Sequence, residues 1–244
     1  MTAVRIEAVS HSYGSRNALA RVNLELSTGV TALLGPNGAG KSTLLGLLSS
    51  ALRLQRGTIE IDELSPDRDA RRYRESIGFL PQQFSVPNHL TCAEFLTLTA
   101  WWRRVGRRRR PELVREALEA VALQDRASAK IRSLSGGMLR RLGIAQAMVN
   151  SPRVLLLDEP TVGLDPRQRA GLREVITELG RTRTVLVSTH LTEDVAAVAD
   201  RVAVLDEGHV TFDGTLADLA KTPAPTATDL DRAYEDLVTD GDLT

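Results

Sequence analysis

The sequence lacks the features that mark secreted and membrane-spanning chains. It contains one cysteine, Cys92, in 244 residues, so no disulfide can form within the chain, which suits a reducing compartment. No apolar run is long enough to cross a bilayer, and residues 1–10 lack the apolar core of a signal peptide. We therefore expect a soluble protein, unless a partner holds it at a membrane.

An excess of charge of one sign and internal repetition are also absent. The formal net charge is +0, so no overall field draws the chain to nucleic acid, and we expect no nucleic-acid partner. We find no internal repeat and no heptad series. The hydrophobic content of 42% and charged content of 25% are ordinary for a globular protein, and the length suits one large α/β domain or two modest ones.

A glycine-rich loop at residues 35–43 is the strongest motif, and it reads Gly-Pro-Asn-Gly-Ala-Gly-Lys-Ser-Thr. It follows a buried-strand pattern at residues 30–34 and precedes a helical stretch at residues 44–49. Its glycines let backbone N–H groups surround phosphate oxygens, its lysine adds charge, and its serine hydroxyl suits Mg²⁺. The predicted phosphate-binding residues are Gly35, Asn37, Gly38, Ala39, Gly40, Lys41, Ser42 and Thr43.

Alternating patterns before this loop predict an antiparallel pair of strands. Val4, Ile6 and Ala8 share one face of the first strand, and residues 22–26 repeat the pattern. Tyr13 lies between the two strands. It is either a turn aromatic packed on the sheet edge or a flat face for a nucleobase, and the pattern leaves both interpretations open.

Two short strands are predicted after the loop, at residues 58–61 and 77–80, with a helix start near Asp67 between them. Gln82 follows the second strand. Such a glutamine is usually a solvated loop residue, and a functional role is the alternative.

Helical patterns replace β-branched runs from residue 91 to residue 149, which predicts an inserted helical subdomain. Its basic run at residues 103–110 is either a solvated helix end and loop, which we favour, or a contact with anionic lipid headgroups or an acidic partner. We expect either Trp101 or Trp102 in the core, because neighbours on a helix cannot face the same way; an exposed one would mark a contact surface. Ser135 is placed to cap the next helix, whose free N–H groups offer a second anion site as the functional interpretation.

Polar residues follow two near-continuous apolar runs that are typical of parallel strands buried on both faces. Asp158 and Glu159 come after residues 154–157, and His190 stands just beyond residues 185–187. The carboxyl ends of such strands form the ligand edge of an open α/β sheet. There Asp158 can hold Mg²⁺ and Glu159 can accept a proton from water, while His190 is equally well explained as a structural residue.

The end of the chain predicts a linker at residues 222–228 and a short helix capped by Asp229. Leu230, Tyr234 and Leu237 share one face of this mostly acidic helix. It either packs on its own domain or touches a second copy, and the sequence does not choose between them.

Taken in order, these motifs resemble the ATP-binding subunit of an ABC transporter over nearly the whole chain, up to about Leu219. The signature loop departs at Met138, where the family usually has glutamine, and methionine lacks the hydrogen bonds of an amide. Residues 136–142 and 229–238 are similar to those of bacterial drug and antibiotic exporters. The matches are Tyr13 to the adenine-stacking aromatic, residues 35–43 to Walker A, Gln82 to the switch glutamine, residues 134–138 to the signature loop, residues 154–159 to Walker B, residues 163–165 to the D-loop, and His190 to the switch histidine.

The resemblance implies an α/β fold: a P-loop NTPase (RecA-like) core with an antiparallel β subdomain and an inserted helical subdomain at about residues 85–150. These would lie within residues 1–220, with a linker and short acidic helix at residues 221–244. The implied cofactors are ATP and Mg²⁺. The implied catalytic residues are Glu159, His190, Gln82 and Lys41; the metal ligands are Ser42, Gln82 and Asp158; and Tyr13, Ser135, Gly137 and Asp165 join the loop residues in binding nucleotide.

The resemblance also implies partners and a location. Two copies would sandwich two ATP molecules, with Ser135 and Gly137 reaching the nucleotide of the other copy. A separate membrane permease would be contacted between Gln82 and about Trp102, on the cytoplasmic face of the cell membrane, for export of a drug-like or lipophilic substrate.

Two other function classes fit less well. A soluble ABC ATPase acting on the ribosome or on DNA usually has two ATPase domains or a coiled-coil insertion, and neither is found here. A phosphate-binding regulator with little turnover would use the change at Met138, but the intact Glu159 and His190 speak against it.

Overall fold

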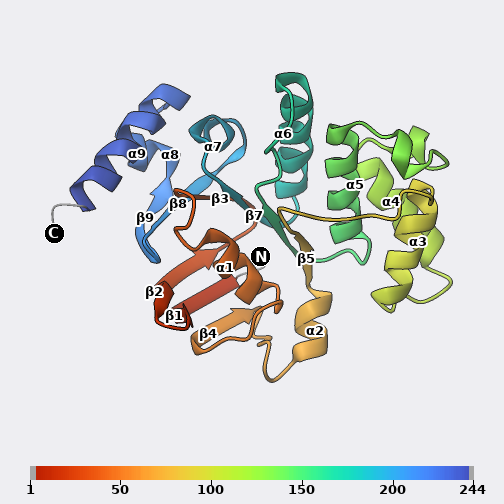
Figure 1. Ribbon diagram of the computed structural model, residues 1–244, viewed down its shortest axis with the longest axis horizontal. Coiled ribbons are helices and arrows are strands. Elements are labelled where there is room, and N and C mark those ends of the chain that lie inside the picture. The colour runs from red at the N-terminus through yellow and green to blue at the C-terminus, as the bar shows by residue number, and fades with distance from the viewer. Residues whose placement is uncertain (1–3, 242–244) are drawn as a thin grey trace.

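Two sheets and nine helices make up the part of the chain that this computed structural model describes, residues 4–241 (Figure 1). The predicted ATPase domain (residues 1–220) and the predicted linker and acidic helix (residues 221–244) include residues 1–3 and 242–244, which lie outside the described residues. The helices are α1 (Lys41–Leu48), α2 (Ala70–Glu75), α3 (Cys92–Trp102), α4 (Arg110–Ala120), α5 (Gly136–Met148), α6 (Pro166–Gly180), α7 (Thr192–Val198), α8 (Leu216–Ala220) and α9 (Ala227–Gly241), with short 3-10 turns at Gln124–Arg126 and Ile131–Ser133.

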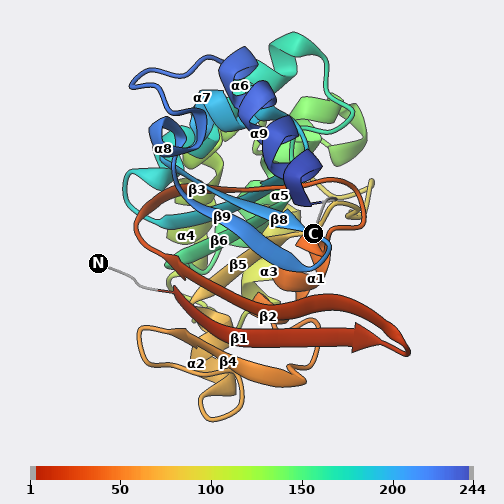
Figure 2. The same ribbon diagram turned by 90° about the vertical axis from the view of Figure 1, so that its left-hand side faces the viewer.

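The larger sheet has six strands and the smaller has three, and Figure 2 shows the smaller one below the larger. The larger is parallel except for its last strand, which runs antiparallel to its neighbour. In spatial order its strands are β5 (Ile77–Leu80), β6 (Val154–Asp158), β7 (Thr184–Thr189), β3 (Gly29–Leu34), β8 (Arg201–Asp206) and β9 (His209–Thr215). The antiparallel sheet has the order β2 (Arg16–Leu26), β1 (Val4–Tyr13) and β4 (Arg56–Ile61).

The middle of the larger sheet is buried on both faces. Every residue of β6 and β7 is buried, and alternate side chains point to opposite faces. Leu156 and Leu186 pack in a cluster with α1 and the antiparallel sheet, whereas Leu155 and Val187 pack in a cluster with α5 and α6. The prediction of two parallel strands buried on both faces is confirmed.

The predicted antiparallel strands are also confirmed, but the face assigned to Ala8 is wrong. Ile6 pairs with Leu24, whereas Val9 pairs with Val22, so β1 carries one extra residue at this point. Ala8 is exposed with φ +50°, and Val9 takes the buried position. Such a bulge moves the following side chains to the other face, which simple alternation cannot reveal.

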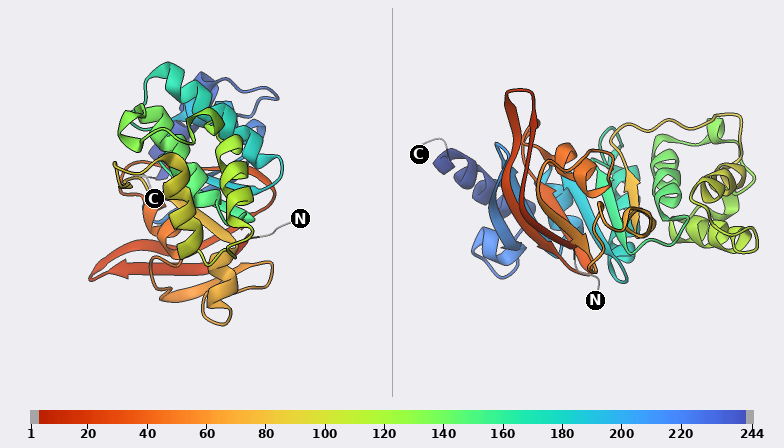
Figure 3. Two further views of the ribbon diagram at one scale, coloured as in Figure 1. Left: turned by 90° about the vertical axis from the view of Figure 1, so that its right-hand side faces the viewer. Right: turned by 90° about the horizontal axis from the view of Figure 1, so that it is seen from below.

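Three helices, α3, α4 and α5, form most of the segment between β5 and β6, and Figure 3 shows them, yellow to green, at one end of the molecule. The predicted helix start near Asp67 is wrong by three residues, because residues 65–69 form a turn and α2 begins at Ala70. The prediction of one core tryptophan is wrong as well: Trp101 is 55% exposed and Trp102 is 71% exposed.

The C-terminal helix packs on its own chain, against α7 and α8 (Figure 1). Leu230 is buried and Tyr234 and Leu237 pack beside it, as the pattern predicts. The predicted cap at Asp229 is wrong: Thr226 Oγ1 accepts from the Asp229 amide at 3.3 Å, and Asp229 Oδ2 accepts in return from the Thr226 amide at 2.9 Å. Thr226 is therefore the capping residue, and the division at residue 220 stays a prediction.

None of the helices within residues 4–241 is long and apolar enough to cross a bilayer.

Close contact between β5 and α5 generates a stability prediction. A Cβ at Gly78 would lie 2.2 Å from the carbonyl oxygen of Ala147, and this backbone atom cannot rotate aside. We expect Gly78→Ala to lower the free energy of unfolding by about 1–3 kcal/mol, the usual cost of overpacking. Urea denaturation would show a lower midpoint with an unchanged slope. Gly106→Ala is the matched control, because nothing lies within 4 Å of its Cβ position, and equal shifts in both variants would contradict the prediction.

Candidate functional site

The loop between β3 and α1 owes its shape to two glycines that lie against neighbouring backbone. A Cβ at Gly35 would lie 2.1 Å from the carbonyl oxygen of Leu205. Gly40 has φ +110°, and a Cβ there would lie 2.5 Å from the carbonyl oxygen of Ala18. Any side chain at either position would push the loop away from β2 and β8. The loop therefore stays tightly curved, and the N-terminal end of α1 points at the centre of the loop.

Lys41, the first residue of α1, is buried under this loop. Its Nζ donates to the carbonyl oxygens of Gly35 at 2.6 Å and Pro36 at 3.1 Å, and lies 3.5 Å from Glu159 Oε1. Burial lowers the pKa of Lys41, and the carboxylates of Glu159 and Asp158 oppose this shift. The lysine is thus a desolvated cation inside a loop of backbone dipoles, a setting that strengthens its attraction for an anion.

Ser188 of β7 holds the two acids at the end of β6, Asp158 and Glu159. Ser188 Oγ donates to Asp158 Oδ1 at 2.5 Å and accepts from the Glu159 amide at 2.9 Å. Glu159 has φ +47°, a left-handed conformation that is costly for a residue with a side chain. The Ser188 contacts hold that conformation and direct the Glu159 carboxylate toward Lys41.

His190 closes the site from the end of β7. Its Nδ1 lies 3.0 Å and 3.1 Å from the two carboxylate oxygens of Glu159. The Glu159 carboxylate is therefore shared between a lysine from the loop after β3 and a histidine from the loop after β7. All three side chains were predicted from the sequence, and the structure brings them together.

A hollow of about 500 Å³ extends from this cluster over the loop. Tyr13, 52% exposed, forms part of its wall. The ring of Tyr13 lies edge to face against the buried ring of His11, with 4.8 Å between the two ring centroids. Sequence reasoning missed His11 and also Arg16, whose guanidinium reaches the Gly38 carbonyl oxygen at 3.5 Å. The residues around the hollow are Tyr13, Arg16, Ala18, Asn37, Gly38, Gly40, Lys41, Ser42, Thr43, Gln82 and Glu159.

Gln82 reaches the hollow from the end of β5, and α5 holds its backbone. Arg140 Nη2 donates to the Gln82 carbonyl oxygen at 2.8 Å, and burial lowers the pKa of Arg140. No role is predicted for Arg140 from the sequence. Because the two residues are 58 positions apart in the chain, no local sequence pattern predicts this contact.

Ser135, Gly137 and Asp165 do not line this hollow. Ser135 caps α5, as predicted, by accepting from the Met138 amide at 3.3 Å, and Asp165 caps α6 by accepting from the Gln168 amide at 2.8 Å. A Cβ at Gly137 would lie 3.0 Å from the Gln168 side chain, so these two helix starts pack together. The three residues thus form a second group, apart from the phosphate loop of the same chain.

A buried acid that the sequence did not single out supports the loops that carry Glu159 and His190. Asp194 of α7, 2% exposed, forms a close ion pair with Arg173 of α6, whose Nε donates to its Oδ1 at 2.7 Å. Thr161 donates to the other oxygen at 2.5 Å, and Thr189 lies 3.4 Å from it. Because Thr161 is two residues after Glu159 and Thr189 precedes His190, Asp194 anchors both loops that carry the site.

Removing the cation from this pair should be strongly destabilising. We expect Arg173→Met to lower the free energy of unfolding by about 3–5 kcal/mol, because Asp194 is then buried without a counter-charge. Urea denaturation measures the loss. Adding Asp194→Asn, which removes the buried charge but keeps an amide for Thr161, should recover much of it.

The matched control is Arg181→Met. Arg181 pairs with Glu178 at 2.8 Å, but the two side chains are 70% and 65% exposed. An exposed pair is worth about 1 kcal/mol at most. If Arg173→Met lowered the free energy of unfolding as little as Arg181→Met does, the buried ion pair would be worth no more than an exposed one.

Comparison with known proteins agrees with this geometry. The family model described as ABC transporter matches residues 19–162. The daunorubicin resistance ATP-binding protein DrrA3 of Streptomyces coeruleorubidus is 39% identical over 220 residues, covering 89% of this chain and 70% of that protein. The Nod factor export ATP-binding protein I of Rhizobium meliloti (strain 1021) is 35% identical over 214 residues, covering 87% of this chain and 64% of that protein.

A solved structure shares the fold as well. The dimeric, post-hydrolysis state of the ATP-binding cassette MJ0796, bound to ADP and phosphate, superimposes with a TM-score of 0.74 at 28% identity, covering 87% of this chain and 98% of that one. The predicted P-loop NTPase fold is thereby confirmed. The chain belongs to the ABC transporter family, as one of its ATP-binding and ATP-hydrolysing subunits.

Proposed function

We propose that this chain powers a separate membrane-spanning permease at the cytoplasmic face of the cell membrane, and that the transporter exports a drug-like or lipophilic substrate. The observation that carries the ATPase part is the single hollow that unites the phosphate loop, Tyr13, Gln82 and Glu159. Export is supported by relatives that are named for drug resistance and for Nod factor export.

The proposed roles follow from the contacts of each side chain. Lys41 and the loop amides hold the outer phosphates, and Tyr13 offers its exposed ring face to the adenine. Glu159 orients the attacking water and accepts its proton, and His190, which contacts that carboxylate, steadies the γ-phosphate. Positioning and charge neutralisation are most of what phosphoryl transfer requires of a protein.

Mg²⁺ is part of the proposal because the donor chemistry fits it. Ser42, Gln82 and Asp158 offer a hydroxyl, an amide and a carboxylate oxygen, and the residues described here include no group of three or more His, Cys, Asp or Glu that would hold a metal by itself. Mg²⁺ commonly takes one or two protein carboxylates and fills its remaining positions with phosphate oxygens and water. When bound, it would neutralise charge on the transferred phosphoryl group.

We also propose that two copies act together. Ser135, Gly137 and Asp165 lie apart from the hollow of their own chain, which supports their contributing to the nucleotide site of a second copy. The structural relative MJ0796 was solved as a dimer with ADP and phosphate. Ser135 and Gly137 would then contact the γ-phosphate, and the change at Met138 removes only the amide contacts of that loop.

Replacing the proposed base should separate binding from hydrolysis. We expect Glu159→Gln to lower the ATPase rate roughly 100- to 10,000-fold, the usual contribution of a general base. It should still bind ATP and dimerise with it, because the phosphate loop is unchanged. Phosphate release, ATP binding and size-exclusion chromatography with Mg-ATP measure these properties. Glu174→Gln, an exposed glutamate of α6, is the control, and normal turnover in Glu159→Gln would exclude Glu159 as the base.

The transporter assignment predicts a membrane partner. Tagged Glu159→Gln protein with Mg-ATP should capture a polytopic membrane protein from detergent-solubilised native membranes, identified by mass spectrometry. The same protein without ATP, and a Lys41→Ala variant that cannot hold the phosphates, are the controls. Capture of ribosomal or DNA-repair proteins instead would replace the transporter assignment with that of a soluble ATPase.

A further inference from the structure

One turn of α3 carries an exposed apolar face. Leu98, Trp101 and Trp102 are 37%, 55% and 71% exposed. Their spacing of three and four residues puts them side by side on the helix. Within residues 4–241 the only other large hydrophobic side chain with comparable exposure is Tyr13, which the nucleotide site accounts for. We call Leu98, Trp101 and Trp102 the aromatic ridge.

Strong positive charge adjoins the aromatic ridge. Six arginines lie in residues 103–110, and no acidic residue occurs between Glu94 and Glu112, although the whole chain has a net charge of +0. Arg103 is partly buried and donates to the carbonyl oxygens of Arg74 and Ile77, at 3.4 Å each. That anchor fixes the end of α3 against α2, and Arg104, Arg107, Arg108 and Arg109 are exposed.

A hollow of about 330 Å³ lies between α2 and the end of α3. Glu75 is its one acid, and Arg71 already pairs with it at 2.8 Å. The side chains of Arg74 and Arg104 have no partner among the residues that the structure describes, so the hollow keeps a net positive charge. It is lined by Arg71, Arg74, Glu75, Trp102, Arg103 and Arg104.

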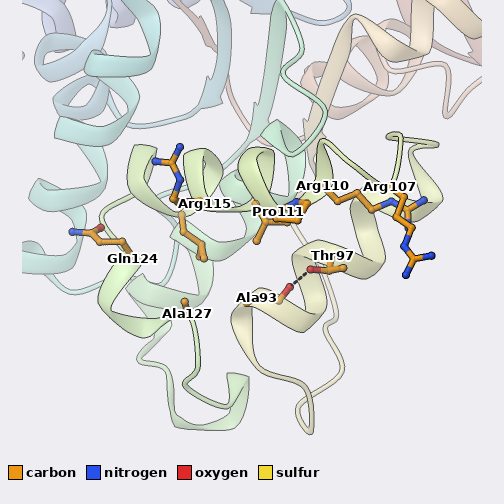
Figure 4. Close-up of a pocket in the computed structure, with 10 residues that line it drawn as sticks. Ala93, Thr97, Arg107, Arg110, Pro111, Arg115, Gln124 and Ala127 are labelled. Atoms are coloured by element: carbon orange, nitrogen blue, oxygen red, sulfur yellow. Dashed lines mark hydrogen bonds between the residues drawn. The ribbon is translucent and has the colours of Figure 1, made fainter.

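A larger hollow of about 570 Å³ between α3 and α4 makes a weaker site. Figure 4 shows Arg107, Arg115 and Gln124 extending to different sides rather than toward one point. Arg115 is also neutralised by Glu119 at 2.9 Å. The hollow beside Trp102 therefore offers the better anion site.

We propose that the hollow beside Trp102 binds the phosphate of an anionic phospholipid, and that the aromatic ridge lies at headgroup depth in the bilayer. Unpaired arginines recognise phosphate groups, and tryptophan is enriched where membrane meets water because its ring has both an apolar body and an N–H donor. The cytoplasmic leaflet carries negative lipids that attract clusters of basic residues. Charge complementarity thus favours a lipid surface over a protein partner.

The inference goes beyond the proposed function, because it gives the ATPase subunit a membrane contact of its own. It takes Trp101 and Trp102 out of the stretch expected to touch the permease, and it leaves the loop after Gln82 for that contact. It holds or fails without any permease present.

The experiment uses vesicles of phosphatidylcholine with and without phosphatidylglycerol. Trp101 and Trp102 are the two tryptophans of the whole chain, so intrinsic fluorescence reports directly on the site. We expect the emission to shift to the blue and the protein to float with the anionic vesicles, while added salt weakens both effects. No shift and no flotation with either vesicle would overturn the proposal.

Variants test whether the site, rather than charge in general, is responsible. Arg74→Gln with Arg104→Gln should weaken vesicle binding about 25-fold, at roughly fivefold per arginine near an anionic surface. Arg5→Gln with Arg56→Gln removes the same charge from exposed positions of the antiparallel sheet and should change binding little, and ATPase activity should be normal in both. Equal losses in both arginine pairs would assign the binding to non-specific attraction. Unchanged vesicle binding in Trp101→Ala with Trp102→Ala would show that the aromatic ridge does not enter the bilayer.

Discussion

The in-register parallel pairing of β6, β7 and β3 is the constraint on which the site depends. Asp158 pairs with Ser188, and Leu34 pairs with Thr189, so the three strands end at one edge. A slip by one residue would exchange the side chains packed on α1 with those packed on α5 and α6, and neither cluster would keep its fit, so the register is fixed. The lysine, the acids and the histidine stand at or beyond the carboxyl ends of these strands, and their meeting is a consequence of sheet pairing.

Helical spacing explains the error at the tryptophans. The buried face of α3 carries Cys92, Phe95, Leu96, Thr99 and Ala100, and the next position of that stripe is residue 103. An arginine stands there, and it is partly buried because its guanidinium reaches two backbone carbonyl oxygens. The prediction placed one tryptophan in the core because neighbours on a helix cannot face the same way, whereas the period of the buried stripe assigns both of them to the outer face.

The sequence predicted most of the strands, the phosphate loop, the Ser135 cap and the side chains of Lys41, Glu159 and His190 at the site, because each depends on a local pattern or a short motif. It could not predict contacts that fix those parts from a distance. Arg140 and Gln82 are 58 residues apart, and Arg173 and Asp194 are 21 apart. In the sequence both arginines look like ordinary polar residues of amphipathic helices. Only the packed structure shows that burial obliges each to find a partner.

The contacts of Glu159 connect the proposed base to the phosphate loop. Its carboxylate lies 3.5 Å from Lys41 Nζ and 3.0 Å from His190 Nδ1, in a site where 4% of the residue is exposed. Phosphate oxygens bound in the loop would reach the same ammonium group, because Lys41 lies inside that loop. The left-handed backbone at Glu159, held by Ser188, fixes the glutamate side chain beside the lysine. The buried lysine thus joins the phosphate loop to the carboxylate of the proposed base.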